Sequence, residues 1–156
     1  MADVELKGVP QLLAKLASVK NDAKYKSGRF ALRKAAQVYV KKIKQNAARL
    51  DDPKSAADIS KNVAERWNGR LFKRTGNLGF RVGILGGAGG NKKSSELSGL
   101  PGGDTRHWRQ LEFGNEHMRA QPFMRRAGED GAQEATDEFV RQYSKGLDRA
   151  IKRGAK

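Results

Sequence analysis

Residues 108–127 read WRQLEFGNEHMRAQPFMRRA, and this segment is the most informative one in a chain of 156 residues. Gly114 and Pro122 interrupt its large apolar side chains, which are Trp108, Leu111, Phe113, Met118, Phe123 and Met124. An apolar run that glycine and proline break cannot form one long helix or strand. We therefore expect a short element that ends near Phe113, a tight loop, and a helix that begins at Pro122.

The next segment, from Pro122 to about Arg153, predicts one long helix. Its first turns hold five acids, namely Glu129, Asp130, Glu134, Asp137 and Glu138. Its last turns hold five bases, namely Arg141, Lys145, Arg149, Lys152 and Arg153. Acids near the start and bases near the end complement the helix dipole, so the order of the charges supports a single helix.

Upstream of the quoted segment, residues 63–73 and 78–85 predict two paired strands around a turn at 74–77. In the second stretch, apolar residues alternate with glycine and arginine, which is the period of a half-buried strand. We expect a third main strand over 105–113. A short edge strand is predicted over 4–7, where Val-Glu-Leu-Lys alternates apolar and polar residues.

Residues 27–50 predict an amphipathic helix with a strongly basic exterior, after a shorter helix over 11–19. Its apolar face is expected to hold Leu32, Ala35, Ala36, Tyr39, Ile43, Ala47 and Leu50. The cations that we expect to face a partner are Arg29, Arg33, Lys34, Lys41, Lys42 and Lys44. Residues 51–53 (Asp-Asp-Pro) are expected to end this helix, and Ser55 and Asp58 have the spacing of a capping box.

The glycine-rich stretch over 86–104 predicts a flexible loop. Such a composition buries too little apolar surface to offset the entropy of ordering the chain. Its apolar anchors are Leu97 and Leu100, which we expect to dock on a neighbouring subunit.

The length of the chain is that of one domain, so we expect a single domain over 1–156. The predicted elements indicate an α+β fold, with an antiparallel sheet of three or four strands flanked by the basic helix and the long C-terminal helix. Cysteine is absent, which excludes disulfides and thiolate metal sites. No apolar run approaches the roughly 20 residues of a membrane span, and the N-terminus does not have the pattern of a signal peptide, so we expect a soluble, cytoplasmic protein.

The net charge of +15 is concentrated in one part of the chain. Residues 20–50 hold ten Lys or Arg against one acid, Asp22, which gives a net charge of +9. Such a field attracts polyanions, and both nucleic acid and an acidic protein surface fit. Binding to single-stranded nucleic acid usually adds exposed aromatic side chains among the cations, whereas we expect Tyr39 to lie in the core.

Two candidate sites for small ligands have the wrong spacing. His107 and His117 lie ten residues apart across Gly114, whereas a catalytic zinc site often uses two histidines four apart on a helix. Residues 86–92 follow a predicted strand and end in Lys92, as a phosphate loop would. A Walker motif needs glycine before this lysine and Ser or Thr after it, and the chain has Asn91 and Lys93. A dinucleotide-binding motif would need glycine at position 92.

Glu112 is the one acid in an apolar setting, between Leu111 and Phe113. We expect it to neutralise a nearby arginine, such as Arg109 or Arg119, within one subunit or between two. The sequence shows no nucleophile–base pair and no pair of carboxylates spaced for acid–base work. An enzyme, a cofactor and a bound metal therefore have little support.

The quoted segment resembles a signature of the head–tail joining or tail-completion family of long-tailed bacteriophages, which is similar in kind to minor tail protein Z. The residues that carry the resemblance are Trp108, Leu111, Glu112, Phe113, Gly114 and Asn115, followed by Ala120, Pro122 and Phe123. The chain departs from the family where Arg126 stands in place of a further proline.

The resemblance implies a structural virion protein of the phage neck that is not an enzyme and is made in the host cytoplasm. It implies an oligomeric ring, with a hexamer as one candidate, that completes the tail and joins it to the DNA-filled head. The expected partners are other copies of the chain, a head adaptor and a tail terminator. Non-specific contact with DNA is compatible with this role, and no membrane is expected as a partner. The motif residues would then be packing and assembly residues.

Two alternatives come from other classes of protein. The charge alone favours a basic nucleic-acid-binding module, for which exposed aromatic side chains beside the cations would be the discriminating feature. A metal-dependent enzyme using His107 and His117 is the weaker alternative, and metal analysis of the purified protein would test it.

Overall fold

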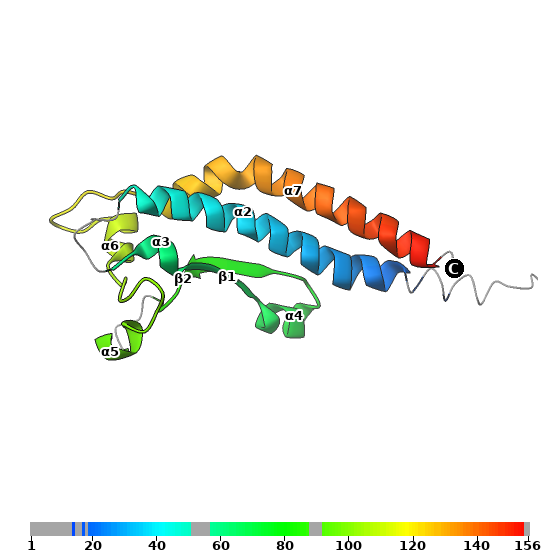
Figure 1. Cartoon of the computed structure of the whole chain (residues 1–156), viewed down its shortest axis with the longest axis horizontal. Helices are drawn as coiled ribbons and strands as arrows, with labels where there is room; N and C mark the ends of the chain where they lie inside the picture. Colours follow the sequence, from blue (N-terminus) through cyan, green and yellow to red (C-terminus); the bar gives the residue numbers. More distant parts are fainter. Residues whose placement is uncertain (1–13, 15–16, 18, 51–56, 88–91, 155–156) are drawn as a thin grey trace, which may run out of the picture.

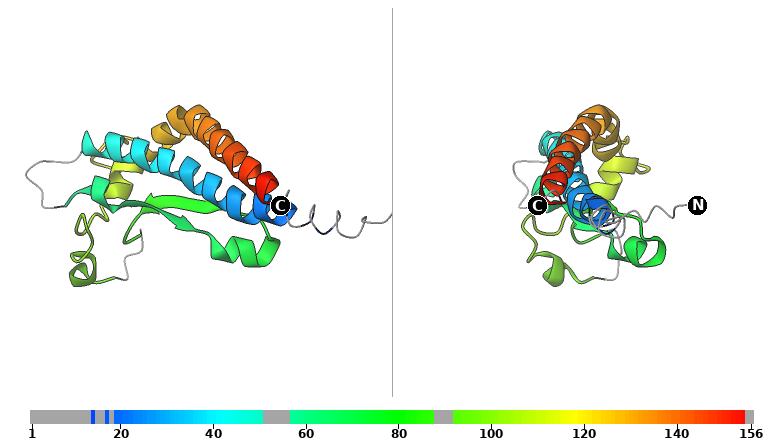
Figure 2. Two further views of the ribbon diagram at one scale, coloured as in Figure 1. Left: turned by 45° about the vertical axis from the view of Figure 1, so that its right-hand side comes forward. Right: turned by 90° about the vertical axis from the view of Figure 1, so that its right-hand side faces the viewer.

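Two long helices lie side by side and antiparallel along the length of the molecule in the computed structural model, which describes residues 14, 17, 19–50, 57–87 and 92–154 (Figure 1). They are α2 (Gly28–Ala48) and α7 (Phe123–Gly154). A π-helical segment, η1 (Asp22–Ser27), precedes α2. A strand hairpin lies along α2 on the side away from α7 (Figures 1 and 2). The predicted long C-terminal helix is confirmed, with its first residue at Phe123.

Small residues allow α2 and α7 to pack closely. Those that are buried are Gly28, Ala31, Ala36 and Ala47 in α2, and Ala127, Gly131, Ala135, Gly146 and Ala150 in α7. A Cβ added at Gly146 would lie 2.5 Å from Cβ of Ser27, and one added at Gly131 would lie 3.2 Å from the ring of Tyr39. The buried face of α2 also includes Val40, which the sequence did not single out.

The sheet has two strands in the part of the chain that the structure describes. β1 (Val63–Trp67) and β2 (Phe80–Ile84) pair antiparallel, with Val63 opposite Ile84 and Trp67 opposite Phe80. The predicted pairing of these two segments is confirmed, but the first strand is shorter than predicted. Residues 69–75 form a helix, α4 (Gly69–Thr75), because the side chain of Asn68 accepts a hydrogen bond from the backbone of Leu71 (3.1 Å) and caps the helix N-terminus.

The third main strand predicted over 105–113 is wrong, since residues 108–113 form a helix, α6 (Trp108–Phe113). Trp108, Leu111 and Glu112 are three and four residues apart and therefore share one face of a helix. That face is the inner one: Trp108 and Leu111 pack against the core, and Glu112 is buried. The sheet of three or four strands is thus corrected to two in the described ranges, and the edge strand predicted over 4–7 lies outside them.

The short helix α3 (Ile59–Asn62) begins one residue after Asp58, whose side chain accepts from the backbone N–H of Ser60 (2.9 Å). Asp58 is therefore the N-cap itself rather than the last residue of a capping box. Ser55, the stop at 51–53 and most of the helix predicted over 11–19 lie outside the described residues.

The second half of the glycine-rich stretch is held by the chain's own residues. Leu97 is buried at the end of α5 (Ser94–Leu97), within contact distance of Gly86. The expectation that Leu97 docks on a neighbouring subunit is therefore wrong, because its own chain already buries it. The fully buried Asn62 accepts from the backbone of Gly102 (2.8 Å) and donates to Thr105 (2.8 Å). Residues 88–91 lie outside the described residues, and the flexibility of 86–104 in the free subunit stays a prediction.

The main core lies where α2, α3, β1 and the start of α7 meet. Its buried members are Val40, Ile43, Ala47, Ile59, Val63, Phe123 and Ala127. Among the helices that the structure describes, none is long and apolar enough to cross a membrane.

Candidate assembly site

The motif loop, which we define as residues 114–122, turns back tightly between α6 and α7. Gly114 has a φ of 76°, and a Cβ there would lie 2.8 Å from the backbone N of Ala120, so the loop needs glycine at this position. Asn115 and Met118 pair across the loop, and the side chain of Asn115 accepts from the backbone of His117 (2.9 Å). The loop therefore has a defined shape.

Glu112 ties α6 to the first turn of α7. Its carboxylate is 2% exposed and accepts from the backbone N–H groups of Met124 (2.9 Å) and Arg125 (3.1 Å). Arg125 also forms an ion pair with this carboxylate (3.2 Å) and donates to the carbonyl of Glu112 (2.9 Å). A negative charge on the free N–H groups of a helix start is favourable. The arginine partner is thus Arg125, rather than the Arg109 or Arg119 that we expected.

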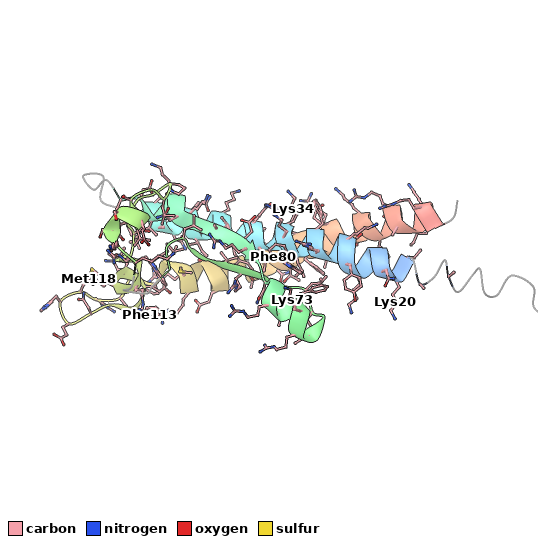
Figure 3. All side chains as sticks on the ribbon, turned by 90° about the horizontal axis from the view of Figure 1, so that it is seen from below. Lys20, Lys34, Lys73, Phe80, Phe113 and Met118 are labelled. Carbon is pink, nitrogen blue, oxygen red and sulfur yellow. The ribbon has the colours of Figure 1, made fainter. Side chains whose placement is uncertain are left out.

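The three aromatic residues of the motif differ in their burial and in their contacts. Phe123 is 2% exposed in the main core, and Trp108 donates its indole N–H to the carbonyl of Gly87 (3.3 Å). Phe113 is 61% exposed, with the guanidinium of Arg125 5.6 Å from its ring centre. Phe113, which the resemblance places among the packing and assembly residues, does not pack onto the core, because only one side of the six-residue α6 faces it. Phe113 and Met118 lie at the same end of the molecule (Figure 3).

The remaining motif residue, Pro122, precedes α7 and lines a hollow of about 390 Å³ at this end of the molecule. Other residues that line it are Asn46, Arg49, Leu50, Gln121 and Arg126. The hollow therefore lies between the end of α2 and the start of α7, beside the motif loop.

The six cations expected to form one basic face are divided between two sides of α2. Arg33 points toward the sheet and pairs with Glu65 (3.3 Å), and Arg29 lies on the same side. Lys42 points toward α7 and pairs with Glu134 (2.8 Å). Lys34 has its ammonium 5.7 Å from the ring centre of Phe30, while Lys41 and Lys44 are exposed.

A second surface, which the sequence did not predict, lies between α2 and the hairpin. We call it the aromatic–basic hollow; its volume is about 570 Å³, and it is lined by Tyr25, Lys26, Arg29, Phe30, Arg33, Glu65, Trp67 and Phe80. The guanidinium of Arg29 lies 4.3 Å from the ring centre of Trp67, whose ring also contacts those of Phe72 and Phe80. The sequence could have suggested Tyr25 and Phe30, which stand among cations, but Trp67 and Phe80 join them only through the strand register.

Glu65 is the carboxylate of this hollow. Burial raises its pKa, but hydrogen bonds from Gln37 (3.2 Å) and Arg33 (3.3 Å) together lower the pKa below its ordinary value. Glu65 is therefore ionised at neutral pH and offsets part of the positive charge around it.

The described residues give no support to a metal centre. Within them, no group of three or more His, Asp or Glu side chains could hold a metal ion, and both His107 and His117 are exposed. Part of the phosphate-loop candidate, residues 88–91, lies outside the described ranges.

One family model matches the chain over residues 11–114, and it is described as "Bacteriophage HK97-gp10, putative tail-component". The matched range covers two thirds of the chain and includes α2, the hairpin and α6 up to Gly114. No curated protein and no solved structure matches.

Proposed function

The chain belongs to the HK97-gp10-like family of bacteriophage tail components, and on this basis we propose that it is a structural protein of the phage neck. In this proposal, several copies form a ring that completes the tail and joins it to the DNA-filled head. A head adaptor above the ring and a tail terminator below it are the proposed neighbours.

The observation that best supports this role is that a large apolar side chain, that of Phe113, is exposed at the end of a helix that hydrogen bonds fix in place. Phe113 is 61% exposed, yet the residue before it, Glu112, is buried and anchored to α7 by hydrogen bonds and an ion pair. Pre-organised side chains of this kind bind partners without paying the entropy of ordering a loop. Isolated large aromatic residues at a fixed position are typical anchors of protein interfaces.

The test of the proposed function is complementation in vitro. Filled heads are mixed with tails made without this protein, and the purified chain is added. We expect the wild-type chain to restore infectivity and Phe113→Ala to restore at least tenfold less, since interface anchors commonly contribute 2 kcal/mol or about 30-fold in binding.

The matched control is Ile151→Ala, which truncates a side chain of similar exposure (51%) near the far end of α7. Because Phe113 is exposed, both variants should melt close to the wild-type temperature. Equal infectivity with both variants would show that the motif loop is not the joining surface, and infectivity without any added chain would contradict the proposed function itself.

The second candidate function is a nucleic-acid-binding module, which the aromatic–basic hollow specifically favours. Exposed Tyr25 and Phe30 stand beside cations there, as in proteins that bind single strands. If the cations bound duplex phosphates, the logarithm of the binding constant would fall with that of salt concentration with a slope of about −0.9 per phosphate contacted. Weak DNA binding without such a slope would favour the structural function.

A further inference from the structure

The aromatic–basic hollow carries an excess of positive charge next to exposed apolar surface. Residues 24–34, which run from η1 into α2, include five cations and no acid. Glu65 alone among the residues lining the hollow is acidic. Tyr25 is 39% exposed and Phe30 45% exposed, so both leave apolar surface open to solvent.

The exposed side of the first half of α7 has the opposite charge, and one exposed apolar side chain lies at its end. Residues 127–140 include five acids and no base. Two of these acids are used inside the chain, because Glu134 pairs with Lys42 and Glu138 pairs with Arg141.

Glu129, Gln133, Asp137 and Val140 are three or four residues apart in turn, so they share one face of the helix, which we call the acidic face. All four are exposed, and Val140 is 55% exposed. No ion pair of Glu129 or Asp137 is found within the part of the chain that the structure describes. Within the described residues the Asp137 carboxylate accepts a hydrogen bond from Gln133 on the same face (2.9 Å). The acidic face therefore offers two carboxylates that form no ion pair there, with Val140 at its C-terminal end.

We propose that the acidic face of α7 in one copy docks into the aromatic–basic hollow of the next copy. The two surfaces belong to different layers, since α2 lies between α7 and the hairpin that forms the hollow's wall (Figures 1 and 2). One copy therefore uses both surfaces at once, each with a different neighbour. Such a head-to-tail contact closes into a ring when the rotation between copies allows it. This inference deepens the proposed function and rests on it.

A second copy is the better occupant of the hollow because its acidic face complements the positive charge there, and because three cations lie over ring faces on which a base would stack. Arg29 lies over Trp67 (4.3 Å), Lys24 over Tyr25 (5.2 Å) and Lys34 over Phe30 (5.7 Å). A base needs an open ring face on which to stack. Carboxylates can reach the charged groups, and a small apolar side chain such as Val140 can fill the space between the ring edges.

Single cysteines test the contact directly, because the chain has no cysteine of its own. Phe30→Cys and Val140→Cys chains are purified separately, mixed with one another and oxidised, alone and on tails that lack the protein. A single cysteine cannot form an intrachain disulfide. The head-to-tail contact predicts a mixed disulfide that forms at least about tenfold faster than either homodimer, since the contact raises the effective concentration of one thiol near the other.

The matched control replaces Phe30→Cys by Glu116→Cys, an exposed position in the motif loop. Its disulfide with Val140→Cys should form at the slow rate of random collision. The proposal is overturned if Phe30→Cys and Val140→Cys link no faster than this control, or if homodimers of Phe30→Cys dominate, which would indicate a symmetric contact.

Charge reversal provides a second, independent test through native mass. One pair is Arg29→Glu in the hollow with Lys24→Glu beside it, where Lys24 lies over the ring of Tyr25. This pair, and separately Glu129→Lys with Asp137→Lys, should each weaken self-association about tenfold or more. The chain with all four changes should associate again, because a reversed hollow then meets a reversed face. Lys145→Glu with Lys152→Glu changes the charge by the same amount at two exposed positions near the end of α7 and should keep the wild-type mass.

Circular dichroism melts identify any variant that fails to fold, and the cysteine test does not depend on these variants. If reversal in the hollow leaves self-association intact but abolishes retention on a DNA column, the hollow binds nucleic acid and the proposal is wrong. The wild-type chain could restore infectivity while Phe30→Cys and Val140→Cys cross-link only slowly. That result would reject this contact but would not contradict the proposed function.

Discussion

Glu112 is the residue on which the geometry of the motif loop depends most. Its buried carboxylate accepts hydrogen bonds from the backbone N–H groups of Met124 and Arg125 at the start of α7. Glu112→Ala should lower the free energy of unfolding by about 2–3 kcal/mol, because it removes a helix cap and leaves buried donors without a partner. Glu116→Ala, in the exposed loop, is the matched control and should change little. Denaturant melts with equal midpoints for the two variants would contradict this role.

Asp104 provides a titration test of the segment between α5 and α6. Hydrogen bonds from Arg106 hold the pKa of Asp104 at about 2, well below its ordinary value. The same guanidinium donates to Ser94 (2.8 Å) and to the carbonyl of Lys92 (3.2 Å). Because the folded pKa is lowered, the stabilisation is present above the ordinary pKa of aspartate and is lost as pH falls toward about 2. NMR should show the Asp104 carboxyl titrating near 2, and near its ordinary value in Arg106→Ala; equal values in both would contradict the pairing.

At the scale of elements, the close approach of α7 to the start of α2 depends on Gly146. A Cβ there would lie 2.5 Å from Cβ of Ser27, so Gly146→Ala forces the helices apart. The expected cost is about 1–3 kcal/mol, as for other overpacked sites. Gly128→Ala in the same helix meets nothing within 4 Å and should instead stabilise by about 0.5–1 kcal/mol. Thermal melts that shift in the same direction for both variants would contradict this packing.

The elements that the sequence predicted well are those with long or strictly periodic patterns. The C-terminal helix has an ordered charge gradient over 32 residues, and residues 80–84 alternate in the way a strand does. By contrast, α6 has six residues, in which the spacing of Trp108 and Leu111 is a weak helix signal. The helix α4 depends on one cap by Asn68, which ends the first strand early. Short elements are decided by such single contacts rather than by periodicity.

The candidate site was predictable only where its residues are neighbours in sequence. Gly114 and the turn after it follow from the motif, whereas the partner of Glu112 lies 13 residues away, across the loop. The aromatic–basic hollow combines Tyr25 and Phe30 with Trp67 and Phe80 from a separate hairpin. No local pattern brings these segments together, so the sequence could suggest Tyr25 and Phe30 beside cations but not the hollow that they form with the hairpin.

For the whole molecule, the exposed cations Lys41 and Lys44 remain proposed contacts for acidic neighbours in the neck. Lys41→Glu with Lys44→Glu should leave the subunit folded and self-associating but block joining of heads to tails, because like charges would then meet across the contact. Lys145→Glu with Lys152→Glu, which changes two exposed cations of α7, is the matched control. Wild-type infectivity from the Lys41 and Lys44 variant in the complementation assay would contradict this use of the charge.

The most direct test of the central claim is the number of copies that bind to each tail made without this protein. Tails are incubated with an excess of the purified chain, separated from it by sedimentation, and weighed by native mass measurement with and without nuclease treatment. We predict that each tail gains a fixed number of several copies, unaffected by nuclease, as a closed ring requires. No binding, a single copy per tail, or binding that disappears with nuclease would contradict the account.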